Sequence, residues 1–190
     1  MSNIIKSLSD IQNGDTLYKN TRWSDRDKKL FMRTVNFSTE VIQSIHKRKL
    51  ITGRDHSEFL CWNQGILETH SSVYGQGVRS MNIENWIPRE DEPDVIILRR
   101  KEKMTKLEYD RFQYLIVKLR GLPYNLKRAM RSILDMKITL GYLDGLFCSE
   151  STMSFSGFEE YEGIWPYACY MAHIQRGDYV AFEGNMKELL

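Results

Sequence analysis

The chain has 190 residues, of which 42% are hydrophobic and 27% are charged, a balance typical of one folded domain and not of a disordered chain. Its 27 basic and 25 acidic residues nearly cancel to a net charge of +2, so no nucleic-acid partner is expected. No apolar run approaches the roughly 20 residues that span a bilayer, which argues against an integral membrane segment.

The first half of the chain shows strand patterns around one helical segment. A short strand is predicted after the Gly14-Asp15 turn, and helical spacing follows over residues 26–49. Asn63-Gln64-Gly65 has the composition of a hairpin turn. The predicted strands of this half are 16–18, 56–62, 65–70, 77–83 and 94–98.

The second half is mainly helical. Thr105 and Glu108 form a capping-box pattern that opens a helix, and Gly121 ends it. A basic helix is predicted over 125–136, another short helix begins near Cys148, and residues 178–183 form a last strand. Strands first and helices later predict an α+β fold, with an antiparallel sheet packed against helices.

The chain contains three cysteines, Cys61, Cys148 and Cys169. An odd number without a CxxC pair disfavours a disulfide scaffold and favours a reducing compartment. The N-terminus has no secretory signal pattern, so a cytoplasmic location is expected. No pair of residues has the spacing of metal ligands, so neither a metal nor a cofactor is expected.

Cys148 lies in the segment LFCSES, where a helix is expected to begin. The positive end of a helix lowers a thiol pKa, and its unpaired N–H groups stabilise an oxyanion. A histidine would supply the base that such a thiol needs. A lone cysteine is nevertheless more often a buried apolar residue, and that interpretation is favoured for Cys61 and Cys169, which lie in apolar runs.

Five short motifs occur in a fixed order along the chain: Gly14-Asp15, His56, Leu67-Glu68 with Gly77-Val78, Gly121-Leu-Pro-Tyr124, and Cys148-Ser149-Glu150. Together they resemble the permuted NlpC-like papain-fold hydrolases, a group that includes the bacterial YiiX-like proteins and a poxvirus homologue. The resemblance implies a single circularly permuted papain-like domain over residues 1–190, with a helical insertion at about 26–49. A phage or viral origin would place the protein in a host cell or a virion.

The same resemblance implies a catalytic triad, in which Cys148 is the nucleophile, His56 the base and Glu68 the carboxylate that holds the ring. His56 and Glu68 are expected as cross-strand neighbours in a hairpin. His70 is an alternative third residue. Tyr124 and Glu150 are candidate substrate-binding residues, although a packed turn aromatic and a surface or salt-bridging carboxylate are equally compatible with them.

Two departures from the family pattern concern the neighbours of the expected site. Ser57-Glu58-Phe59 replaces an apolar strand after the histidine, and Ser151-Thr152-Met153 follows the cysteine motif in place of Leu-Val. The expected activity is cleavage of an amide bond, in a peptide or cell-wall peptide, through an acyl-enzyme. A lipid acyl hydrolase or acyltransferase and a catalytically inactive binding protein on the same fold are the alternatives.

Overall fold

The computed structural model describes residues 4–19, 56–87, 94–133, 145–159, 164 and 166–190. The helix expected over 26–49 lies outside these residues. The strands are β1 (Thr16–Lys19), β2 (His56–Asn63), β3 (Ile66–Val73), β4 (Gly77–Asn82), β5 (Asp94–Arg99) and β6 (Tyr179–Asn185). The α-helices are α2 (Ile83–Trp86), α3 (Lys106–Leu119), α4 (Leu126–Ile133), α5 (Cys148–Phe155) and α6 (Pro166–Arg176), and the 3-10 helices are η1 (Leu8–Asp10) and η4 (Met186–Leu189).

The strands form one sheet in the order β4-β3-β2-β1-β5-β6, and each neighbouring pair is antiparallel. The expected mixed architecture with an antiparallel sheet is therefore confirmed. Gln64 and Gly65, which join β2 to β3, have φ values of 49° and 81°. Positive φ at both central residues is the requirement of the two-residue hairpin turn that matches strand twist.

Two of the expected helices begin where their local sequence indicates. Thr105 caps α3 by accepting a hydrogen bond from the Glu108 backbone N–H, and the Glu108 carboxylate accepts one from the Thr105 backbone N–H. The helix expected near the nucleophile candidate begins at Cys148 itself. The sequence patterns did not predict α2 and α6. No helix within the described ranges is long and apolar enough to cross a bilayer.

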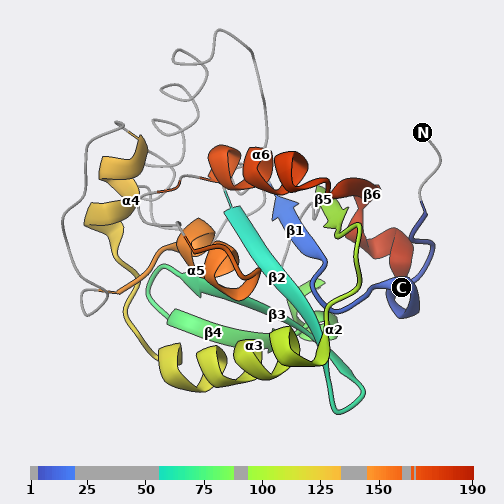
Figure 1. Ribbon diagram of the computed structural model, residues 1–190, viewed down its shortest axis with the longest axis horizontal. Coiled ribbons are helices and arrows are strands. Elements are labelled where there is room, and N and C mark those ends of the chain that lie inside the picture. The colour runs from blue at the N-terminus through green and yellow to red at the C-terminus, as the bar shows by residue number, and fades with distance from the viewer. Residues whose placement is uncertain (1–3, 20–55, 88–93, 134–144, 160–163, 165) are drawn as a thin grey trace, which may run out of the picture.

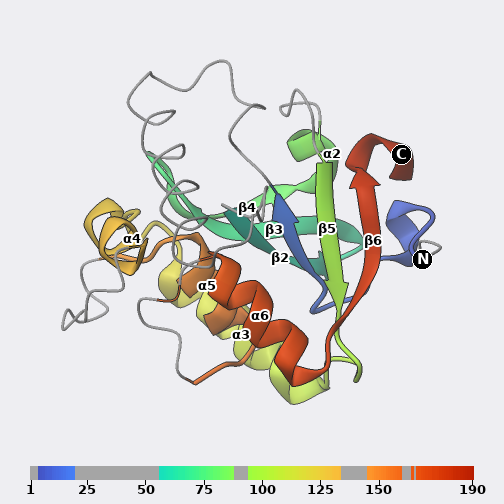
Figure 2. The same ribbon diagram turned by 90° about the horizontal axis from the view of Figure 1, so that it is seen from above.

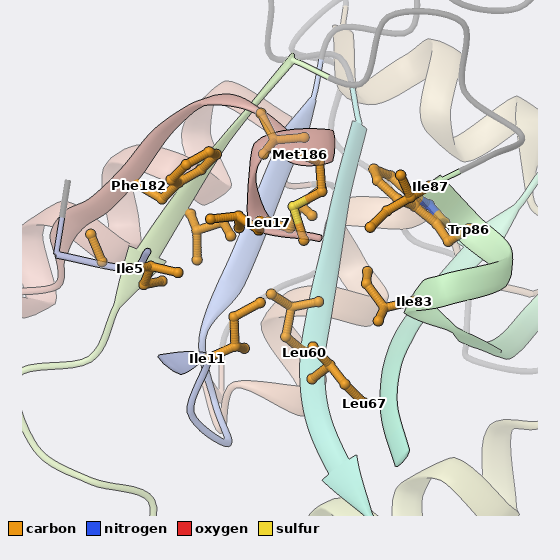
Figure 3. Packing of buried hydrophobic residues seen from close by; sticks show 14 residues of the cluster. Ile5, Ile11, Leu17, Leu60, Leu67, Ile83, Trp86, Ile87, Phe182 and Met186 are labelled. Carbon is orange, nitrogen blue, oxygen red and sulfur yellow. The ribbon is translucent and has the colours of Figure 1, made fainter. Parts of the chain in front are cut away.

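Side-chain alternation divides the sheet into two buried faces. Helices α3, α5 and α6 cover one face, as Figure 2 shows. The other face carries an apolar cluster in which Leu17, Leu60, Trp86 and Phe182 pack together (Figure 3). Polar side chains on the inner strands, such as Glu58 and Thr69, are therefore buried.

Candidate functional site

The segment before α5 is fixed by hydrogen bonds from two directions. Leu146 donates its backbone N–H to Pro123 O at 3.2 Å, and its carbonyl accepts from Asn125 N at 3.1 Å. The same carbonyl accepts from Ser72 Oγ at 2.6 Å. Because Cys148 follows two residues later, the first turn of α5 is held against the end of β3 (Figure 1).

Two glycines make this close approach possible. A Cβ on Gly145 would lie 2.1 Å from Pro123 O, and a Cβ on Gly77 would lie 2.2 Å from Leu122 O. Both glycines also have positive φ, which other residues rarely adopt. The Gly-Leu-Pro-Tyr turn is thus packed between β4 and the segment that leads to Cys148, which explains why these motifs occur together.

The first turn of α5 is also tied to β3 through Ser151. Its hydroxyl accepts a hydrogen bond from Ser72 N at 3.0 Å and donates to Cys148 O at 2.7 Å. Cys148 itself is 3% exposed. Its position at the start of a helix gives the thiol nearby backbone N–H groups that have no partner within the helix.

His56, the first residue of β2, contacts a carboxylate on its own strand. His56 Nε2 lies 3.0 Å from Glu58 Oε1, and the two side chains are 13% and 1% exposed. Residues two apart in a strand point to the same face, so the pleat of β2 alone brings this pair together. Glu58 was absent from the candidate residues predicted from sequence, although its spacing from His56 is the signal that would have found it.

The charges around His56 favour its protonated form. Burial alone lowers the imidazole pKa, but hydrogen bonding and charge interactions with Cys148 and Glu58 outweigh burial and raise the pKa to about 9. Burial likewise raises the Glu58 pKa, yet the His56 hydrogen bond and charge, with Lys19 and Arg79 nearby, bring it well below its ordinary value. The structure therefore joins Cys148, His56 and Glu58 into one electrostatic unit.

Glu68 lies elsewhere, so the expected cross-strand contact with His56 is corrected. In the β2–β3 register Glu68 is opposite Cys61. Cys61 is five residues from His56, which corresponds to about 16 Å along a strand. Glu68 also points to the opposite face of the sheet from His56, by alternation, and its Oε2 lies 3.6 Å from His70 Nε2. The structure does not bring Glu68 to the His56 ring.

His70 is packed among aromatic side chains on the helical face. Its ring centroid lies 4.9 Å from that of Phe112 and 6.4 Å from that of Phe155, and its Nδ1 is 2.8 Å from Ser80 Oγ. Burial lowers the His70 pKa to about 3, so the ring is neutral. Phe155 ends α5 and Cys148 begins it, which places His70 near the far end of the helix from the thiol.

Tyr124 and Glu150, the predicted substrate-binding residues, have different surroundings. Tyr124 forms a backbone bridge with Leu146 and its ring packs edge-on against Tyr74, with centroids 5.9 Å apart. Glu150 is 0% exposed and accepts a 2.7 Å hydrogen bond from Arg128 on α4. The Glu150 carboxylate therefore joins α4 to α5, whereas Tyr124 remains beside the segment that leads to the thiol.

The remaining cysteines are buried, as expected. Cys61 and Cys169 are each 0% exposed. Burial raises the pKa of both thiols to about 12. Cys169 Sγ lies 3.3 Å from the Tyr18 hydroxyl in the cluster between the sheet and α6. Neither thiol is ionised near neutral pH, in contrast to what a nucleophile requires.

No family model and no curated protein sequence matches the chain. Among solved structures, the chain is similar to the metalloprotein yiiX from Escherichia coli O157:H7, with a TM-score of 0.51 and 12% identity. The match covers 94% of this chain and 91% of that one. The chain therefore has a YiiX-like fold, which confirms that part of the resemblance noted in its sequence.

The donor set of the described residues does not fit a metal centre of the usual kind. Within those residues, no three or more His, Cys, Asp and Glu side chains are grouped so that they could hold a metal ion. Cys148 and Glu58 instead both interact with the imidazole of His56. This arrangement is typical of an activated thiol.

Proposed function

We propose that the protein is a cysteine hydrolase in which Cys148 is the nucleophile, His56 the base and Glu58 the carboxylate that orients the ring. The observation that carries the proposal is the interaction of His56 with both other residues, with a His56 pKa raised to about 9. A protonated His56 stabilises the thiolate that Cys148 forms when it gives its proton to the ring. We further infer that the domain is a circularly permuted papain-like fold, since the histidine strand precedes the cysteine helix in the chain.

The chemistry proceeds in two balanced steps. His56 takes the proton of the Cys148 thiol as the sulfur attacks a substrate carbonyl carbon, and backbone N–H groups at the start of α5 hold the resulting oxyanion. The imidazolium of His56 gives its proton to the leaving amine as the carbon–nitrogen bond breaks. His56 then takes a proton from water as that water attacks the thioester, and the ring returns the proton to the Cys148 sulfur as the acid is released. Glu58 keeps the imidazolium oriented throughout.

The substrate class proposed is an amide, including peptide and cell-wall peptide bonds, and a lipid acyl ester is the competing substrate. Both pass through the same acyl-cysteine, so the site chemistry serves either. A panel of peptides, isopeptides, peptidoglycan fragments and acyl esters would separate them. Covalent capture of the acyl group on Cys148, found by mass spectrometry of the intact protein, would identify the accepted class.

The proposal is tested by the rate at which iodoacetamide alkylates each cysteine at pH 6.5. Cys148 is expected to react at least about tenfold faster than Cys61 and Cys169, whose raised pKa values keep them as thiols. The His56→Ala variant should abolish this advantage. Equal, slow alkylation of all three cysteines in the folded protein would instead support an inactive binding protein.

A further inference from the structure

Glu58 receives a second hydrogen bond that the proposed reaction does not use. Its Oε1 accepts from His56 Nε2 at 3.0 Å and from the Trp86 indole Nε1–H at 2.9 Å. The other oxygen, Oε2, is buried and has no hydrogen-bond partner within the described residues. The same oxygen that contacts the imidazole is thus fixed by two donors, one from β2 and one from α2.

Trp86 is itself immobilised, so its N–H has a fixed direction. Its side chain is 1% exposed and packs in the apolar cluster with Ile83 and Ile87 (Figure 3). The short helix α2 that carries it begins with an Asn82 cap, whose side chain accepts from Glu84 N at 2.8 Å. A donor locked by packing holds its acceptor at a lower entropic cost than a mobile donor.

Lys19 reinforces the same arrangement from the face of the indole ring. Its Nζ lies 4.8 Å from the Trp86 ring centroid, a cation–π contact. Lys19 is paired with His56 in the β1–β2 register and is 5% exposed. Its buried charge also acts on the Glu58 carboxylate and lowers the Glu58 pKa. A cation over the ring draws electron density from the indole and makes its N–H a stronger donor.

We propose that Trp86 is a positioning residue of the Cys148 site, holding Glu58 Oε1 against the His56 ring while Lys19 holds the indole. This inference rests on the proposed function. Trp86 contacts neither the thiol nor the reacting atoms, and it acts through Glu58. Without the indole N–H, the carboxylate is free to turn away from His56, and the imidazolium loses part of its stabilisation.

The test is the Trp86→Phe variant, which keeps an aromatic ring and removes the N–H. Its His56 imidazole, followed by NMR, is expected to titrate about one pH unit lower than in the unsubstituted protein, a tenfold change in the protonation equilibrium. Alkylation of Cys148 at pH 6.5 should slow as well. The matched control is Trp62→Phe, which removes a 2.7 Å indole bond to Ile11 O and leaves Glu58 untouched.

Identical His56 titrations in the two variants would overturn the positioning role. Equal, slow alkylation of all three cysteines in the unsubstituted protein would refute the proposed function instead, so the two failures are distinguishable. A second measurement uses the unsubstituted protein, so the test does not depend on correct folding of the Trp86 variant. The indole N–H resonance of Trp86 should shift with the same midpoint as the His56 ring, whereas that of Trp62 should not, and a Trp86 resonance that does not follow His56 would also overturn the inference.

Discussion

The choice between Glu58 and Glu68 as the partner of His56 gives the sharpest test of the site. Glu58→Gln removes the charge and preserves the shape of the side chain. The His56 pKa of about 9 lies well above its ordinary 6.5, a difference of about 3 kcal/mol. Cys148 and Glu58 share this effect, so removal of one charge should lower the His56 pKa by at least about one pH unit.

The assay is the NMR titration of the His56 ring, with the alkylation rate of Cys148 as a second measurement. The control is Glu68→Gln, the same chemical change on the neighbouring strand, where the carboxylate faces His70 and not His56. Glu68→Gln is expected to leave both measurements unchanged. An equal fall of the His56 pKa in both variants, or a fall in Glu68→Gln alone, would refute the assignment of Glu58.

Three further predictions concern stability, each measured by urea unfolding. Gly145→Ala should destabilise the fold by about 2 kcal/mol more than Gly121→Ala. Both glycines have positive φ, but only at Gly145 would an added Cβ clash with backbone atoms. Similar losses of stability in the two variants would contradict this prediction. Glu150→Ala should cost about 3 kcal/mol, since it removes the carboxylate that faces buried Arg128, and a loss below about 1 kcal/mol would show a weak pair. His70 has a folded pKa of about 3, so its unfolded form gains protons as pH falls below 6.5, and the protein should lose about 2 kcal/mol between pH 7 and 5. His70→Gln should remove that loss, and an unchanged pH dependence in this variant would point to another group.

The strands and the starts of α3 and α5 could be predicted from the sequence because interactions between residues close in the chain determine them. The turn at Gln64-Gly65 needs positive φ, and the Thr105–Glu108 box satisfies its own backbone donors. Helix α6 was missed although Pro166 starts it and Gly177 follows its end, because its aromatic residues are equally typical of a strand. Its stability comes from packing on the sheet, where Cys169 contacts Tyr18.

The contact of Glu68 with His56 was wrongly predicted because the order of the motifs along the chain does not contain the strand register. The β2–β3 turn, by contrast, does specify the strand register. A two-residue turn at Gln64-Gly65 pairs Asn63 with Ile66, and counting back from there places Glu68 opposite Cys61. The alternation rule that would have selected Glu58 needs only the sequence. By contrast, the buried pair of Glu150 with Arg128 joins two helices, and nothing in local sequence patterns specifies which helices meet.

The placement of His56 and Glu58 on one strand makes their separation a property of three consecutive residues. A change in the length of the β2–β3 loop, or a slip of β3 along β2, leaves this distance intact, whereas a pair divided between strands would be lost. The thiol has no such protection, since Cys148 depends on the Gly145 and Gly77 contacts that hold α5. Changes at these two glycines are therefore expected to displace Cys148 while the His56–Glu58 pair stays intact.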